Sequence, residues 1–189
     1  MNKSEIKKTF ENSAKIILDS KKLEKPLLDT ISLVTESLKN KKKIIIFGNG
    51  GSAADAQHMS AEFVGRYLKE RHSFSAIALT ADSSILTALG NDYGFENIFS
   101  RQCEGLVKNG DVVFAISTSG NSKNVLNGIL KSKNLGAKVI SLTGNNISKM
   151  KKYSNIIIPV PSNDTPRIQE AHRTIIHIIC EQVEKNLSD

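Results

Sequence analysis

The chain has little of what marks a secreted or membrane-bound protein. It has only two cysteines, Cys103 and Cys180, among 189 residues. They lie far apart, each in an apolar helical pattern, so we expect two buried thiols in a reducing compartment rather than a disulfide. The N-terminal segment has no apolar signal core, and no apolar run approaches the length of a membrane span. We therefore expect a cytoplasmic protein with no membrane partner.

Aromatic residues are also scarce, with seven phenylalanines, three tyrosines and no tryptophan. The chain is basic, with 26 Lys and Arg against 19 Asp and Glu and a formal net charge of +7. The lysines are spread over several short runs without interleaved aromatic residues, which is typical of solvated helix ends and loops. We therefore expect no nucleic-acid partner. The positive field instead favours an anionic metabolite.

Residues 43–66 contain a strand, a glycine-rich turn and a helix in that order. Residues 44–47 are apolar and mostly β-branched, as in a buried strand. Glycines dominate the turn that follows, and Ser52 begins a run of good helix formers. This order places backbone N–H groups and the positive end of a helix against an anion. The sequence therefore predicts an anion cradle at residues 48–52.

His58 and Glu62 lie four residues apart on the same predicted helix, so both side chains point from one face. Small residues flank the pair, which favours close packing against another element. The same spacing is also common in surface ion pairs. The pair follows the anion cradle on the same predicted helix, however, and this position indicates an active site.

Strands and helices alternate along the rest of the chain. We predict helices over residues 3–20 and 23–40, strands over 44–47, 74–79, 111–116, 138–143 and 155–160, a loop over 90–94, and a last long helix over 165–187. Each strand is a nearly continuous apolar run, which predicts a parallel sheet covered by helices on both faces. No domain linker interrupts the chain, so we expect one domain over residues 1–189. Ligands of such sheets bind at the carboxyl ends of the strands.

A second loop at that edge, residues 117–122, reads Ser-Thr-Ser-Gly-Asn-Ser. Hydroxyl groups, free N–H groups and a helix dipole together suit a phosphate monoester without requiring Arg or Lys. The alternative is a helix N-cap and nothing more. One serine suffices for a cap, so four hydroxyls in six residues favour phosphate.

The first glycine turn also fits a loose dinucleotide-binding pattern, Gly48-x-Gly50-x-x-Ala53. That fingerprint requires an acidic residue about 20 positions further on, at the end of the second strand. Here the interval reaches Glu70, which precedes the second strand. The fingerprint is incomplete, and the sequence disfavours a nicotinamide enzyme.

The last helix carries Gln169, Arg173 and His177 at four-residue intervals on one face. Isoleucines surround His177. A histidine in such a run is more often a core residue than a catalyst, so both interpretations of His177 stay open on pattern alone.

Taken together, the motifs resemble a known family. The stretches GNGGSAADAQHMSAEFVGRY, GNDYGFENIFSRQ, DVVFAISTSGNSKNV, KVISLTG and RIQEAHRTIIHII are similar to those of sugar isomerase (SIS) domain proteins, and more closely to the phosphoheptose isomerases. The resemblance covers nearly the whole chain, in family order. It implies a flavodoxin-like three-layer α/β/α sandwich with a five-stranded parallel sheet. It also implies a homotetramer, with two extra N-terminal helices in residues 1–40 that pack on the core and in the oligomer.

The resemblance implies an aldose–ketose isomerase that converts D-sedoheptulose 7-phosphate into D-glycero-D-manno-heptose 7-phosphate through a cis-enediol. This reaction is the first step of nucleotide-activated heptose synthesis, for lipopolysaccharide core or capsule. The alternative is a non-catalytic SIS module that binds a phosphosugar or the replication initiator. Relatives of that kind lack the Glu and the second His, so Glu62 and His177 favour the enzyme.

Site residues follow from the same resemblance, position by position. Substrate contacts are implied for Asn49, Gly50, Gly51, Ser52, Glu62, Arg66, Asn91, Asp92, Ser117, Thr118, Ser119, Ser122 and Gln169. One zinc ion per subunit is implied, bound by His58, Glu62, Gln169 and His177. Glu62 and His177 are also the implied acid/base pair, and since a tight ligand is not a free base, the catalytic need for zinc stays open. Sites are implied at subunit boundaries, and we expect Glu62 of one chain to work with His177 of its neighbour.

Overall fold

The computed structural model describes residues 3–146 and 148–188, so positions 1, 2, 147 and 189 of the predicted domain lie outside the described residues. The elements in chain order are helix α1 (Lys3–Asp19), 3-10 helix η1 (Ser20–Leu23), α2 (Glu24–Lys39), β1 (Ile44–Gly48), α3 (Gly51–Val64), β2 (Ala76–Ala78), α4 (Ser83–Tyr93), 3-10 helix η2 (Phe95–Asn97), α5 (Ile98–Leu106), β3 (Val112–Ser117), α6 (Lys123–Asn134), β4 (Lys138–Thr143), α7 (Ser148–Lys151), β5 (Ile156–Pro159) and α8 (Thr165–Leu187).

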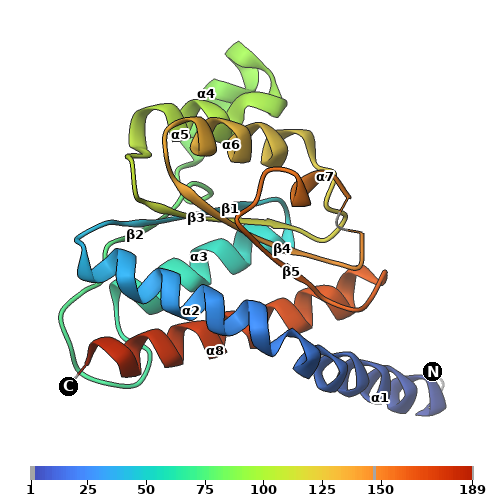
Figure 1. The fold of residues 1–189 in the computed structure, drawn as a ribbon. Helices are drawn as coiled ribbons and strands as arrows, with labels where there is room; N and C mark the ends of the chain where they lie inside the picture. The colour runs from blue at the N-terminus through green and yellow to red at the C-terminus, as the bar shows by residue number, and fades with distance from the viewer. Residues whose placement is uncertain (1–2, 147, 189) are drawn as a thin grey trace.

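The described strands form one five-stranded parallel sheet in the order β2-β1-β3-β4-β5. Helices α2, α3 and α8 cover one face, and α4, α5, α6 and α7 cover the other (Figure 1). The predicted α/β/α sandwich is confirmed. Because the strand order changes direction between β1 and β3, the loops after these two strands flank the crevice where open sheets of this kind bind ligands.

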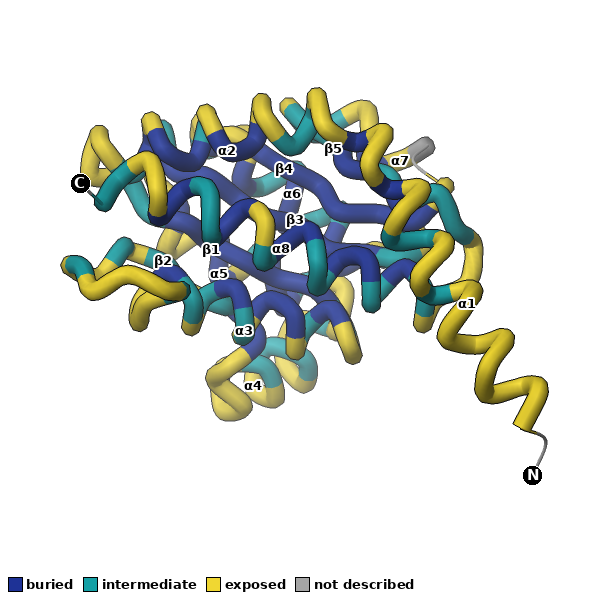
Figure 2. The backbone as a smooth tube through the Cα atoms, turned by 90° about the horizontal axis from the view of Figure 1, so that it is seen from below, coloured by how far each residue is buried: buried dark blue, intermediate teal, exposed yellow. Residues whose placement is uncertain are grey.

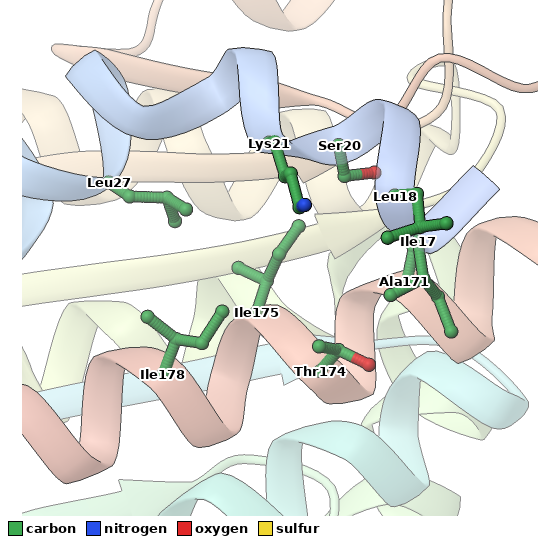
Figure 3. A pocket seen from close by; sticks show the side chains of 9 residues that line it. All are labelled: Ile17, Leu18, Ser20, Lys21, Leu27, Ala171, Thr174, Ile175 and Ile178. Carbon is green, nitrogen blue, oxygen red and sulfur yellow. The ribbon is translucent and has the colours of Figure 1, made fainter. Parts of the chain in front are cut away.

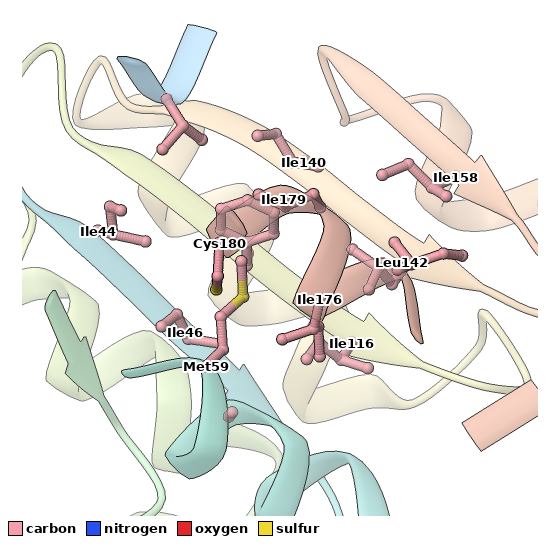
Figure 4. Packing of buried hydrophobic residues seen from close by; sticks show 14 of the residues in the cluster. Ile44, Ile46, Met59, Ile116, Ile140, Leu142, Ile158, Ile176, Ile179 and Cys180 are labelled. Carbon is pink, nitrogen blue, oxygen red and sulfur yellow. The ribbon is translucent and has the colours of Figure 1, made fainter. Parts of the chain in front are cut away.

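Both faces of the central strands are buried. Ile44 and Ile46 of β1 face the layer of α3 and α8 and belong to one buried cluster with Met59 and Ile176, in which Ile46 lies beside Met59 (Figure 4). The alternate residues, such as Phe47, face the α5–α6 layer. Strands buried on both faces require apolar residues at every position, which explains the unbroken runs in the sequence.

Two predicted boundaries change in the structure. The predicted loop over residues 90–94 is wrong, because α4 continues through it to Tyr93. Gly94 ends the helix with φ of +83°, a backbone conformation suited to glycine. The second strand is shorter than predicted and spans only Ala76–Ala78 at one edge of the sheet. The other edge strand ends at Pro159, as its proline predicted.

Helix α1 lies at the border of the fold and runs outward toward the N-terminus (Figures 1 and 2). Among its described residues none is buried, and Ile6 and Phe10 have exposed fractions of 47% and 74%. Helix α2, in contrast, buries residues such as Val34 against the α8 layer. Within the described ranges, no helix combines the length and apolarity that a bilayer crossing requires.

Both cysteines are buried and unbridged, as predicted. Cys103 lies in the α5–α6 layer, where it accepts a hydrogen bond from Ser132 Oγ at 3.3 Å. Burial raises the pKa of the Cys103 thiol to about 11 and also raises the pKa of Cys180. Both thiols therefore stay protonated at neutral pH.

His172 of α8 is fully buried, with its Nε2 atom 3.1 Å from the carbonyl oxygen of Thr143. Burial lowers its pKa from 6.5 to about 4. Between these two pH values the unfolded chain binds a proton that the folded chain does not. The free energy of unfolding should therefore fall by about 3 kcal/mol as the pH drops through this window. Urea denaturation at several pH values measures this fall.

The variant His172→Gln keeps a donor for Thr143 but does not titrate, so its stability should depend less on pH in this window. His72→Gln, at an exposed position, should behave like the wild type. Equal pH dependence in all three proteins would show that His172 is not the titrating group.

Candidate active site at the carboxyl edge of the sheet

Two loops lie side by side at the carboxyl ends of β1 and β3. Gly48 pairs with Ile116 in the sheet register, and a Cβ atom on Gly48 would lie 2.8 Å from the Ile116 carbonyl oxygen. The chain then turns at Gly50, which has a φ of +55° and precedes the first residue of α3. Glycine is needed at both positions, the first for close approach and the second for the turn.

A reciprocal pair of amides joins the two loops. Asn49 Nδ2 donates to Asn124 Oδ1 at 2.9 Å, and Asn124 Nδ2 donates to Asn49 Oδ1 at 2.8 Å. Asn124 Oδ1 also accepts the Val125 N–H at 2.9 Å, near the start of α6. The Asn49 amide thus holds the loops in place. Sequence reasoning missed Asn124, whose one available signal was its position just after the serine-rich loop.

The serine-rich loop brings its hydroxyl groups together. Ser117 Oγ lies 3.1 Å from Ser122 Oγ and 3.4 Å from Ser119 Oγ. Ser122 is the N-cap residue of α6, yet among the described residues its side chain makes no capping hydrogen bond. This observation argues against the simple N-cap interpretation. Three hydroxyls beside a helix N-terminus are suited to a phosphate group.

Helices α3 and α8 pack together on one face of the sheet, and α3 begins at the first of these loops (Figure 1). Gly51 at the start of α3 lies against the Gln169 amide, since a Cβ atom there would come within 2.8 Å of Gln169 Cδ. One turn further, Arg173 NH2 lies 2.7 Å from Asp55 Oδ1. Burial raises the pKa of Asp55, and Arg173 opposes that rise. The pair lies three residues before His58 on α3 and four residues before His177 on α8, and therefore on the same two helix faces.

The next contact along these helices is a cluster of His58, Glu62 and His177. His58 Nε2 lies 2.8 Å from His177 Nε2 and 3.3 Å from Glu62 Oε1. One donor atom from each of the three residues lies within 4.8 Å of the others, and all three residues are half-buried. The structure therefore joins the two predicted functional faces, and His177 belongs to a polar cluster, not to the apolar core.

The cluster is suited to a divalent metal ion. Two imidazoles and a carboxylate form a donor set found in catalytic zinc sites, with further positions left for water or substrate. Burial lowers the pKa of His58, and nearby Arg173 and His177 lower it further against the opposing effect of Glu62. A neutral imidazole is the form that binds a metal.

The expected division of Glu62 and His177 between two chains is wrong, because one chain brings both residues together. Gln169 contacts Gly51 and lies two helical turns, about 12 Å along α8, from His177. Its role as a metal ligand stays a prediction.

Three predicted substrate residues lie apart from the cluster. Arg66 follows the end of α3 and is exposed, with its Nε 3.5 Å from Glu70. Asn91 and Asp92 lie on exposed positions of α4, in the layer on the other side of the sheet, and are hydrogen bonded to each other at 2.8 Å. Their substrate contacts stay predictions.

Comparisons with known proteins agree on one family. Residues 9–144 match the family model described as the SIS domain. A phosphoheptose isomerase of Aquifex aeolicus is 51% identical over 181 residues, which cover 95% of each chain. The structure of phosphoheptose isomerase from Neisseria gonorrhoeae is 39% identical with a TM-score of 0.91, covering 96% of this chain and 98% of that one. That of Francisella tularensis is 32% identical with a TM-score of 0.93, covering 98% and 100%.

The metal-binding capacity of the cluster is open to direct measurement. We expect His58→Ala to retain much less divalent metal after dialysis than the wild type, which should retain roughly one ion per chain. The reason is that only two of the three residues whose donor atoms could hold the ion, Glu62 and His177, remain. Elemental analysis gives the content, and His72→Ala, which removes an exposed histidine, should match the wild type. Undiminished metal in His58→Ala would remove His58 from the ligand set.

Proposed function

The chain belongs to the phosphoheptose isomerases of the SIS domain family and is a sugar phosphate isomerase, and we propose that it converts D-sedoheptulose 7-phosphate into D-glycero-D-manno-heptose 7-phosphate through a cis-enediol. The observation that supports this most directly is the His58–Glu62–His177 cluster, which joins α8 to the helix that begins at the anion cradle. A module that only binds a phosphosugar needs the serine-rich loop but not this cluster. We further propose that the reaction is cytoplasmic and opens the path to nucleotide-activated heptose.

The phosphate end of the substrate is assigned to the serine-rich loop. The hydroxyls of Ser117, Ser119 and Ser122 converge there, and the N-terminus of α6 adds its partial positive charge. Thr118 lies in the same loop, and Ser52 lies in the first turn of α3 across the crevice. Binding the phosphate at this point lets the sugar chain extend along α3 toward Glu62.

Glu62 and His177 are assigned the proton transfers. Isomerisation removes one proton from C1 of the ketose and returns a proton to C2, while the carbonyl oxygen on C2 gains a proton and the hydroxyl on C1 loses one. The Glu62 carboxylate is the base for the carbon-bound proton. The His177 imidazole, which both donates and accepts, moves the proton between the two oxygens.

We also propose that the metal ion of the cluster is zinc, one per subunit. When bound, it would polarise the substrate carbonyl as a Lewis acid. In this scheme His58 would serve only as a ligand, whereas Glu62 and His177 would help to hold the ion and also move protons.

Glu62→Gln should abolish turnover, with a loss of at least 10²-fold in kcat. The amide has nearly the same shape as the carboxylate but cannot accept the C1 proton. The assay follows the aldose product from sedoheptulose 7-phosphate, identified directly. Glu70→Gln changes an exposed carboxylate beyond the end of α3 and should keep the wild-type rate. Wild-type turnover by Glu62→Gln would rule out Glu62 as the base.

We propose that the active form is a homotetramer that covers the outer face of α1, α2 and α8. Exposed apolar residues gather on these helices: Ile6, Phe10, Leu18, Leu28 and Ile178. Two of them, Leu18 and Ile178, line a largely apolar pocket of about 220 Å³ between the α1–η1–α2 segment and α8 (Figure 3). An apolar surface of this kind is typical of a protein interface.

Light scattering should therefore give four times the chain mass of 20.7 kDa. Phe10→Asp should lower this mass, because it places a charge in the apolar face. Leu106→Asp, on the opposite layer and 36% exposed in the wild type, is the matched control and should leave the mass unchanged. A wild-type mass equal to one chain would contradict the proposed assembly.

A further inference from the structure

A buried carboxylate holds the segment that follows α3. Glu184 of α8 is 2% exposed, and its two oxygens accept three consecutive backbone N–H groups, those of Tyr67 at 2.8 Å, Leu68 at 2.7 Å and Lys69 at 2.8 Å. Arg71 Nε donates a fourth bond at 3.0 Å. Burial works to raise the pKa of Glu184, but these donors outweigh it and hold the pKa below its usual value. Glu184 is thus an ionised anchor in a nest of backbone donors.

Three other hydrogen bonds of Arg71 hold the end of α3. Its NH2 group donates to the carbonyl oxygen of Glu62 at 2.9 Å, and its NH1 group donates to those of Phe63 at 3.1 Å and Gly65 at 3.2 Å. The last carbonyls of a helix lack hydrogen-bond partners inside the helix, and here the Arg71 guanidinium donates to them. Its flat face also stacks on the Phe74 ring, 3.8 Å from the centroid. One side chain therefore fixes the helical turn that carries the Glu62 carboxylate.

The same nest positions Tyr67. The Tyr67 ring lies beside the His177 imidazole, with centroids 5.8 Å apart and planes inclined by 51°. Its backbone N–H is bonded to Glu184, which lies seven residues after His177 and hence on the same face of α8. Glu184 thus connects both catalytic side chains to one helix, Glu62 through Arg71 and His177 through the Tyr67 ring.

We propose that Arg71 and Glu184 are positioning residues of the isomerase, which hold the end of α3 and the Tyr67 ring in place so that Glu62 and His177 face the same substrate carbons. This inference rests on the catalytic roles proposed for Glu62 and His177. Neither positioning residue touches the substrate. Their effect on the reaction passes through the Glu62 backbone and the Tyr67 ring.

A purely structural buried ion pair elsewhere in the chain provides a matched control. The Asp111 carboxylate, with a side chain that is 2% exposed, accepts Lys43 Nζ at 2.6 Å, the Lys43 N–H at 3.1 Å and the Lys108 N–H at 2.8 Å. It lies just before β3, at the amino edge of the sheet. Like Glu184, it combines one cation with backbone donors, but its partners Lys43 and Lys108 lie outside α3 and α8.

The experiment compares Glu184→Gln with Asp111→Asn at a temperature where circular dichroism shows both folded. We expect Glu184→Gln to lower kcat at least tenfold with KM changed less than twofold, because the phosphate loop is untouched. Asp111→Asn should keep kcat within twofold of the wild-type value, even if its melting temperature falls by as much as that of Glu184→Gln. Equal losses of kcat in the two variants, or a wild-type kcat in Glu184→Gln, would overturn the inference.

If Glu184→Gln does not fold, Tyr67→Ala replaces it as the test variant. This variant removes the ring but keeps the backbone N–H that binds Glu184. We expect a lower kcat in Tyr67→Ala and recovery in Tyr67→Phe, which restores the ring beside His177. A wild-type kcat in Tyr67→Ala counts against the inference. Wild type and Glu62→Gln are assayed in parallel. An inactive wild type would reject the proposed function itself, and full activity of Glu62→Gln would reject the role proposed for Glu62. An inactive Glu62→Gln beside a fully active Glu184→Gln rejects the positioning role alone.

Discussion

The packing of α3 against α8 is the constraint on which the site depends. The two helices meet at successive turns, first at Gly51 and Gln169, then at Asp55 and Arg173, and last at the histidine pair. Because a helical turn is about 5.4 Å long, a slip by one turn would move His177 out of reach of His58 and Glu62. Gly51 permits a close approach, and the ion pair between Arg173 and the buried Asp55 carboxylate fixes the register. The functional cluster is therefore a product of helix packing more than of any local motif.

The sheet supplies the second requirement, a fixed edge on which two loops are joined. Strands β1 and β3 are buried on both faces, so their ends are held rigidly. The polar groups at that edge bind one another, as in the Asn49–Asn124 amide pair and the linked serine hydroxyls. These internal bonds leave helix N-termini directed at the crevice, which is where an anionic group is stabilised.

The sheet, its helical layers and the two loops could be predicted from the sequence, because apolar runs, glycines and hydroxyl residues mark them directly. It also placed His58 with Glu62 on one helix face and Gln169, Arg173 and His177 on another. Periodicity does not show which faces meet, and for that reason Glu62 and His177 were wrongly divided between chains. The predicted loop over residues 90–94 was wrong, because the helix continues past Gly90 and ends only at Gly94. The Glu184 nest was invisible, since three of its four donors are backbone groups.

The two cysteines give the protein a practical property. Cys103 and Cys180 are buried in separate layers on opposite faces of the sheet, and both thiols are held in the protonated, unreactive form. The outer surface of the folded chain thus presents no competing thiolate among its described residues. A single cysteine introduced at an exposed position of α1 would be the one site that maleimide reagents modify. Fluorescent or spin-label probes of chain association can therefore be attached without first removing the native cysteines.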